Sequence, residues 1–133
     1  ASANCWAKLQ RLYWNCAKAP APFLKKLQSA PELWFLKLSG SNLSHEDYLL
    51  IAKLASLRQL DIANNKIDKE DLQALTALDK LTTLRVQGCH IGPDCIAVFK
   101  KFKSLVHLEI LSGGASDPNF AALRTALPGV RIH

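Results

Sequence analysis

The residues best suited to metal or redox chemistry lie together in the stretch GCHIGPDC, residues 88–95. Cys89 and Cys95 stand six residues apart, and His90 and Asp94 lie between them. Thiolates, imidazoles and carboxylates are zinc ligands, and two thiols can form a redox couple. The stretch does not contain a complete ligand set, however, and the haem-attachment pattern C-x-x-C-H lacks its first cysteine. We therefore predict neither a metal site nor a cofactor here.

The remaining candidates for catalysis do not form a constellation either. Two acidic pairs, Glu46–Asp47 and Glu70–Asp71, recur at equivalent places in the chain, which is typical of helix starts, whereas a catalytic pair is expected once. The glycine pair at 113–114 is not followed by the lysine of a phosphate-binding loop. The histidines fall at unrelated positions of the repeat described below, so no two are expected to act together: His45, His90, His107 and His133. The sequence predicts a protein that is not an enzyme.

The composition is typical of one globular domain, and we expect residues 1–133 to form it. Of the 133 residues, 49% are hydrophobic and 21% are charged, which suffices for a core and a polar surface. No apolar run approaches the roughly 18 residues needed to cross a bilayer. The net charge of +6 is compatible with anionic partners but does not require them.

The sequence is compatible with more than one cellular compartment. Four cysteines are too few for a disulfide scaffold: Cys5, Cys16, Cys89 and Cys95. Apparently unpaired cysteines favour an intracellular, soluble protein. If the opening Ala-Ser-Ala is the remnant of a cleaved signal, the protein is secreted or periplasmic instead.

A repeat of 24 residues organises the chain. Five segments begin with leucine at this interval: Leu9, Leu33, Leu57, Leu81 and Leu105. Counting that leucine as position 1, apolar residues recur at positions 4 and 6, which predicts a short strand with one buried face. Apolar residues at positions 16, 19 and 22 predict a short helix in the second half of each repeat. Ser44, Asp68 and Ser116 at position 12 are N-cap residues, and Pro93 suits a first helical turn.

The pattern L-x-x-L-x-L-x-x-(N/C)-x-L followed by a helix resembles the leucine-rich repeat family, in its 24-residue, ribonuclease-inhibitor-like bacterial form. The resemblance covers residues 9–126, and residues 127–133 fit a terminal cap strand with Leu127, Val130 and Ile132 at positions 1, 4 and 6. It implies an α/β right-handed solenoid, with a parallel sheet on the concave face and one helix per repeat on the convex face. Such domains mostly serve as protein-interaction platforms, although the fold names no partner.

The register also gives the two cysteines a structural interpretation. Cys89 occupies position 9, where the family places Asn or Cys facing inward. Cys95 is expected to be half exposed in the first helical turn, where the helix N-terminus lowers a thiol pKa, so it is the more reactive of the two. Trp6 falls at position 22 of a repeat without a beginning, so we expect either the C-terminal part of a longer protein or an atypical N-terminal cap.

Position 5 faces outward on the predicted sheet and carries charges of alternating sign. The column reads Tyr13, Lys37, Asp61, Arg85 and Glu109. Two interpretations stay open. The column is either a strip that binds a charged ligand or a ladder of cross-strand pairs that neutralise one another.

Exposed aromatic residues gather on the first two predicted strands. Tyr13, Trp34 and Phe35 lie near several cationic residues, and aromatic and arginine side chains are typical of interface hot spots. Alternatively, the N-terminal segment covers them, or Trp34 belongs to the edge packing. The predicted contact residues on the concave face are Arg11, Tyr13, Trp34, Phe35, Lys37, Arg58, Asp61, Arg85 and His107.

Lysines cluster on the predicted convex helices, away from the aromatic residues: Lys25, Lys26, Lys100, Lys101 and Lys103. Nucleic-acid binding needs a basic stripe interleaved with stacking aromatics, so these lysines favour a solvated surface. Neither nucleic acid nor a small molecule is the expected partner. We predict a non-catalytic module that binds a protein through the concave face. The alternatives are a structural or regulatory appendage of a larger protein and weak binding of anions or nucleic acid by the basic helices.

Overall fold

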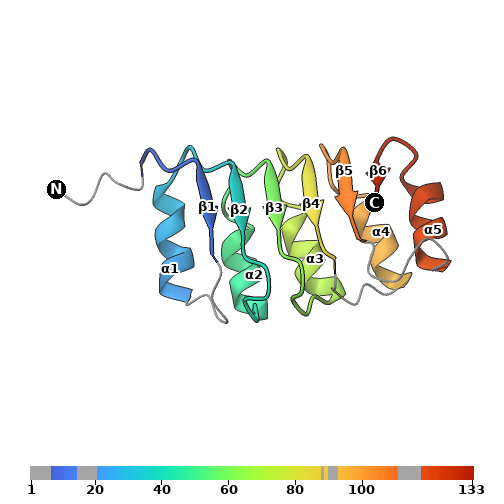
Figure 1. Ribbon diagram of the computed structural model, residues 1–133, viewed down its shortest axis with the longest axis horizontal. Helices are drawn as coiled ribbons and strands as arrows, with labels where there is room; N and C mark the ends of the chain where they lie inside the picture. The colour runs from blue at the N-terminus through green and yellow to red at the C-terminus, as the bar shows by residue number, and fades with distance from the viewer. Residues whose placement is uncertain (1–6, 15–20, 88, 90–92, 111–117) are drawn as a thin grey trace.

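The computed structural model describes residues 7–14, 21–87, 89, 93–110 and 118–133 of the chain (Figure 1). A six-stranded parallel sheet runs through it in the order β1 to β6. Each residue of a strand lies beside the residue 24 positions further along, as in Leu12 beside Leu36 and Leu36 beside Leu60. The strands are β1 (Arg11–Tyr13), β2 (Phe35–Lys37), β3 (Gln59–Asp61), β4 (Thr83–Arg85), β5 (His107–Glu109) and β6 (Arg131–Ile132).

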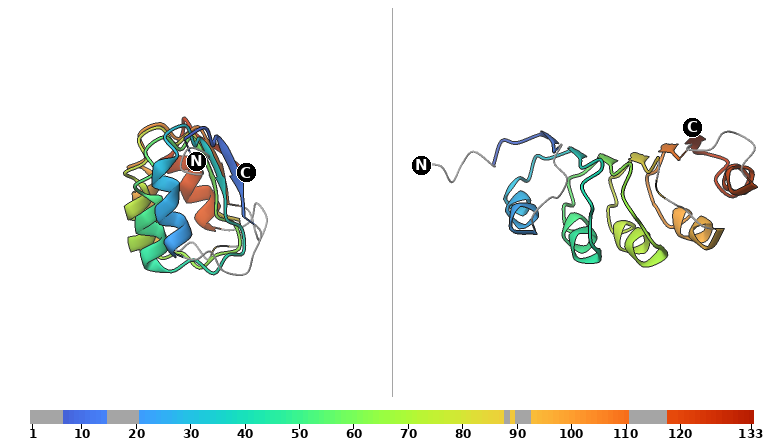
Figure 2. Two further views of the ribbon diagram at one scale, coloured as in Figure 1. Left: turned by 90° about the vertical axis from the view of Figure 1, so that its left-hand side faces the viewer. Right: turned by 60° about the horizontal axis from the view of Figure 1, so that its bottom comes forward.

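Short helices cover one side of this sheet. Figure 2 shows the helices in a row on the outer side of a gentle arc and the strands on its inner side, which confirms the predicted α/β solenoid. None of the helices in the described residues is long and apolar enough to span a membrane. The helices are α1 (Ala21–Lys26), η2 (Leu27–Ser29), α2 (His45–Ile51), α3 (Lys69–Leu75), η3 (Pro93–Cys95), α4 (Ile96–Phe99) and α5 (Pro118–Ala126), where η denotes a 3₁₀ helix.

The core is built from the same repeat positions in every unit. Leucines at position 4 of the central strands are completely or almost completely buried, and so are the residues at position 19 of the helices, which face them. Full burial of each such side chain stabilises the fold by about 1.5–3 kcal/mol. Tyr48 stands at position 16, where the two neighbouring repeats have Leu24 and Leu72, and its buried hydroxyl donates a hydrogen bond to the carbonyl of Lys66 at 2.9 Å. Burial raises the pKa of this hydroxyl far above its usual range.

Position 9 places polar side chains inside the array. Asn65 is buried; its Oδ1 accepts from the backbone N–H groups of Ser41 and Leu43, at 3.1 and 3.2 Å. Its Nδ2 donates to three backbone carbonyls, the shortest bond reaching Leu38 at 2.9 Å. Cys89 is buried at the same position and donates to the carbonyl of Ile62 at 3.3 Å. The inward orientation predicted for position 9 is therefore confirmed for Asn65 and Cys89.

Two predicted helix starts are confirmed, and each proves to be a reciprocal capping box. Ser44 accepts from the N–H of Asp47, and Asp47 accepts from the N–H of Ser44. Asp68 and Asp71 make the same two bonds at the start of α3. The acids that follow each cap thus serve as hydrogen-bond acceptors as well as favourable charges at the helix dipole. Ser116 lies outside the described residues.

Two expectations were wrong. Cys95 is buried, with 3% of its surface exposed, because the fourth helix opens with the tighter turn η3, which directs this residue inward. The expected half exposure and reactivity of Cys95 are therefore not supported. The last strand keeps the full 24-residue interval, so Ile132 pairs with Leu108 at position 4 and does not arrive two residues early.

Candidate functional site

Aromatic residues and one arginine form a continuous patch on β1 and the start of β2. The Tyr13 and Phe35 ring centroids are 4.9 Å apart, and Trp34 meets Phe35 edge-on at 6.0 Å. The Arg11 guanidinium lies 5.6 Å from the Tyr13 and Phe35 ring centroids and 5.7 Å from that of Trp34. We call Arg11, Tyr13, Trp34 and Phe35 the aromatic patch.

The strand register brings these residues together. Arg11 pairs with Phe35 across the sheet, and both side chains occupy position 3, which faces away from the helices. Tyr13 follows at position 5 of the same strand, and 55% of its surface is exposed. Trp34 precedes β2, where its N–H donates to the carbonyl of Gln10 at 2.9 Å. Sequence reasoning placed all four residues on this face.

Phe35 differs from the expectation of an exposed contact. Only 8% of its surface is accessible, because the Tyr13 ring and the Arg11 guanidinium lie close against it. Phe35 therefore supports the patch from beneath, and Tyr13, Arg11 and Trp34 present the surface that a ligand would meet. The sequence pattern predicts on which side of the sheet a side chain lies, but not whether neighbouring side chains bury it.

A groove adjoins the patch at the amino ends of β2, β3 and β4, where the segments that connect each helix to the next strand lie. Its volume is about 570 Å³. Trp34 forms part of its wall, together with the exposed side chain of Arg58. The complete lining is Pro31, Glu32, Trp34, Ser56, Arg58, Gln59, Lys80 and Thr82.

The charged column at position 5 is paired internally. The Lys37 ammonium lies 3.9 Å from the Asp61 carboxylate. The Arg85 Nε donates to the Glu109 carboxylate at 3.0 Å. Asp61 is 7% exposed and also accepts from the Ser39 hydroxyl at 3.0 Å. These contacts favour the ladder of cross-strand pairs over the strip that binds a charged ligand.

His107 lies at the other end of the inner face, partly exposed on β5. Its ring stacks on that of His133, with centroids 6.4 Å apart. This ring contact does not test the prediction that no two histidines share a metal or form a catalytic pair. The contact was not foreseen, because the sequence register placed residues 127–133 two positions early, whereas the full 24-residue interval pairs Ile132 with Leu108 and so brings His133 beside β5.

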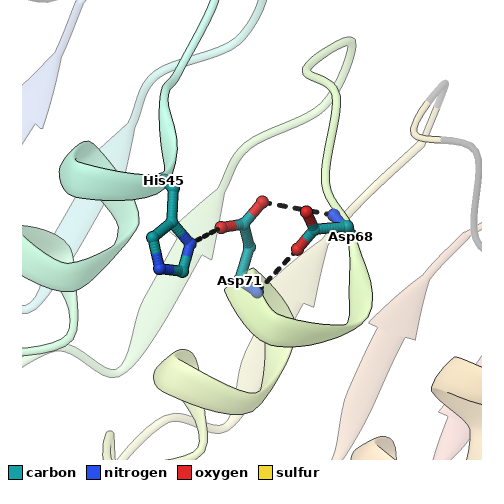
Figure 3. Close-up of side chains that lie close together, drawn as sticks. All are labelled: His45, Asp68 and Asp71. Atoms are coloured by element: carbon teal, nitrogen blue, oxygen red, sulfur yellow. Dashed lines mark hydrogen bonds and ion pairs between the residues drawn. The ribbon is translucent and has the colours of Figure 1, made fainter.

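A second cluster of titratable groups links the starts of α2 and α3 (Figure 3). One ligand atom from each of His45, Asp68 and Asp71 lies within 4.8 Å of the others. The His45 Nδ1 is 2.5 Å from an oxygen of Asp71, and this hydrogen bond raises the pKa of His45. The backbone N–H of Asp71 lowers the pKa of Asp68.

The contacts of this cluster have a structural explanation. One oxygen of each carboxylate accepts a backbone N–H of the capping box, and the second Asp71 oxygen contacts His45. The cluster therefore joins neighbouring repeats through a helix cap. Sequence reasoning missed the contact between His45 and Asp71, although positions 13 and 15 of consecutive repeats could have indicated it.

The predicted basic surface is present on the helical side. Lys25 and Lys26 end α1, and Lys100, Lys101 and Lys103 follow α4, all exposed. Lys103 pairs with Asp79 at 3.5 Å. These lysines lie on different elements from the aromatic patch, as the sequence predicted.

Comparison with known proteins places the architecture in a recognised group. Residues 53–75 and 78–94 match the model of a family described as Leucine Rich repeat. No curated protein matches the sequence. The fold is similar to the tropomodulin C-terminal domain of Caenorhabditis elegans, with a TM-score of 0.64 and 17% identity over 92% of this chain and 84% of that one.

Two bacterial proteins have a similar fold. One is a leucine-rich repeat protein of Leptospira interrogans, with a TM-score of 0.55, 18% identity, and coverage of 94% of this chain and 37% of the other. The other is an internalin of Listeria monocytogenes, with a TM-score of 0.58, 21% identity, and coverage of 99% and 45%. The present chain thus spans less than half of either bacterial protein, and at these identities the likeness concerns the fold alone.

Proposed function

We propose that this chain, a leucine-rich repeat protein, binds a protein partner through the inner face of its sheet. Members of the leucine-rich repeat family typically act as non-enzymatic protein-interaction modules. We propose further that the aromatic patch is the centre of that interface. The observation that carries the proposal is the exposed Tyr13 ring held over Phe35 beneath Arg11.

The composition and order of the patch support this role. Tyrosine, tryptophan and arginine dominate the binding energy of protein interfaces. The contacts of Arg11 with three rings hold the patch in one arrangement before a partner arrives, which reduces the entropy lost on binding. The exposed Tyr13 ring lies on the same patch as the partly exposed Trp34, and neighbouring apolar surface of this kind is typical of a site that a ligand covers.

The other predicted contacts would contribute unequally. Arg58 adjoins Trp34 in the groove and is the strongest addition to the patch. Lys37 and Arg85 already have partners on neighbouring strands, so we assign them to the periphery of the interface. Asp61 is almost completely buried and would act only by holding Lys37 in place. His107 lies four strands away from β1, and only a partner that follows the whole sheet would contact it.

Site-specific photo-crosslinking tests the proposal. A photoreactive benzoylphenylalanine replaces Tyr13 in one variant and Leu49 in the other, an apolar residue of α2 that is 43% exposed on the helical side. We expect a protein adduct in the host lysate from position 13 and none from position 49. Tyr13→Ala should then weaken binding of the captured protein at least about tenfold, in the range of interface hot spots, with the melting temperature unchanged.

Two results would contradict the proposal. Equal adducts from both positions would mean that the inner face has no special role. A large fall in melting temperature for Tyr13→Ala, without loss of binding, would make the patch a packing feature. A structural appendage predicts the first outcome, in which the inner face does not matter.

A further inference from the structure

The groove beside Trp34 is part of a longer depression along one rim of the solenoid. A second hollow of about 440 Å³ shares Pro31, Ser56 and Lys80 with the groove of about 570 Å³. Together they extend from Trp34, at the inner face, to Lys53, at the end of α2. We call this depression the rim groove. Each hollow alone has the size of a ligand-binding pocket.

The rim groove carries an excess of positive charge from side chains without an ion-pair partner. Arg58, Lys80 and Lys53 line it, and among the residues that the structure describes none of these three has an ion-pair partner. The acidic lining residues are Glu32 and Asp79, and Asp79 is paired with Lys103 at 3.5 Å. An occupant with carboxylates would therefore meet an attractive potential.

Apolar side chains line both hollows of the rim groove. Trp34 and Pro31 line the hollow of about 570 Å³, so an apolar side chain of a ligand could pack there, and Leu27, Leu54 and Ala55 are among the residues that line the other hollow. The hydroxyls of Ser56 and Thr82 donate to backbone carbonyls of this chain and add no free donor. The rim groove thus combines apolar side chains with three cations, Arg58, Lys80 and Lys53.

We propose that the rim groove binds an acidic peptide segment of the partner, with an apolar side chain against Trp34 and carboxylates beside Arg58 and Lys80. This inference rests on the proposed function and names the chemistry of the recognised segment. Single-stranded nucleic acid fits less well, because successive bases need several aromatic platforms and the groove has one.

Fluorescence anisotropy with defined peptides tests the inference. The probe is a labelled eight-residue peptide with a central leucine flanked by aspartates. The comparison ligands are the same peptide with lysine for aspartate and an eight-nucleotide oligothymidine. We expect the acidic peptide to bind, the basic peptide not to bind, and the oligothymidine to bind at least about tenfold more weakly than the acidic peptide.

Charge reversal locates the site. Arg58→Glu and Lys80→Glu should each weaken binding of the acidic peptide at least about tenfold. The matched control is Lys66→Glu, the same change at an exposed residue between β3 and α3, on the opposite rim, which should change affinity less than about twofold. Thermal unfolding of each variant confirms that it is folded.

The inference is overturned if the acidic peptide shows no binding up to about 1 mM, if Lys66→Glu weakens it as much as Arg58→Glu, or if the oligothymidine binds more tightly. Failure of this inference can be distinguished from failure of the proposed function. A partner that crosslinks at position 13 while no acidic peptide binds would leave the inner face in place and reject the rim groove. Absence of both would reject both.

Discussion

A single side chain, Asn65, satisfies backbone groups that would otherwise be buried without partners. It accepts two N–H groups from residues 41 and 43 of the preceding repeat and donates to carbonyls of both repeats. A buried donor or acceptor without a partner costs about 1–3 kcal/mol. The hydrogen bonds of the Asn65 amide therefore contribute more to the free energy of unfolding than the packing of so small a side chain would.

We expect Asn65→Ala to lower the free energy of unfolding by about 3 kcal/mol, since several backbone groups lose their partner at once. The denaturant midpoint should fall with the slope of the transition unchanged. Asn64→Gly is the control, because Asn64 is exposed at φ 58°, which glycine adopts freely, so the change should stay within about 0.5 kcal/mol. Equal effects of the two variants would contradict the role given to Asn65.

The sequence identified such residues well where their position repeats. The 24-residue register predicted that Asn65 and Cys89 face inward and that Arg11, Tyr13 and Trp34 lie on one face. It did not predict that Phe35 is covered, because cover depends on the rotamers of Tyr13 and Arg11. It also missed the hydrogen bond of His45 with Asp71, whose partners are 26 residues apart.

At the scale of elements, α2 and α3 are joined at their starts as well as through the core. His45 on α2 contacts Asp71, the residue that closes the cap of α3. Because this hydrogen bond raises the pKa of His45 above 6.5, protonation strengthens the link between the two helices. The link contributes fully below pH 6.5 and is lost as the pH rises through the raised pKa.

We therefore expect the stability difference between the native protein and His45→Gln to be largest below pH 6.5 and to vanish at higher pH. An NMR titration of His45 should give a midpoint above 6.5, which Asp71→Asn lowers while leaving an oxygen to accept the N–H of Asp68. A pH-independent difference, or a midpoint unaffected by Asp71→Asn, would refute the link.

The boundaries of the elements show where local sequence was insufficient. Ser44 and Asp68 predicted two helix starts correctly, because an N-cap side chain acts within its own turn. The fourth helix has no such cap in the described residues and opens with a 3₁₀ turn, so Cys95 was placed wrongly. The register of β6 depends on pairing with β5, which periodicity alone did not reveal.

The whole molecule is a row of units in which each contacts its neighbours. Strands β2 to β5 pair on both sides, whereas β1 and β6 pair on one side. In such arrays stability is a sum of unit and interface contributions, so terminal units open more readily than central ones.

Hydrogen exchange should follow this order. We expect backbone amides bonded between β3 and β4, such as that of Ile62 to Arg85, to exchange at least about tenfold more slowly than those at the ends. The terminal examples are the amide of Trp14, bonded to Lys37, and that of His133, bonded to Leu108. Uniform protection after correction for intrinsic rates would indicate that the array opens as a single unit.

Cys89 stands where Asn65 stands one repeat earlier, and its thiol donates to the carbonyl of Ile62 as the Asn65 amide donates to that of Leu38. It is 4% exposed, and burial raises the pKa of its thiol, so an alkylating reagent can reach a reactive thiolate only when this part of the array opens. The rate at which a thiol reagent alkylates Cys89 should therefore report how often this part of the array opens.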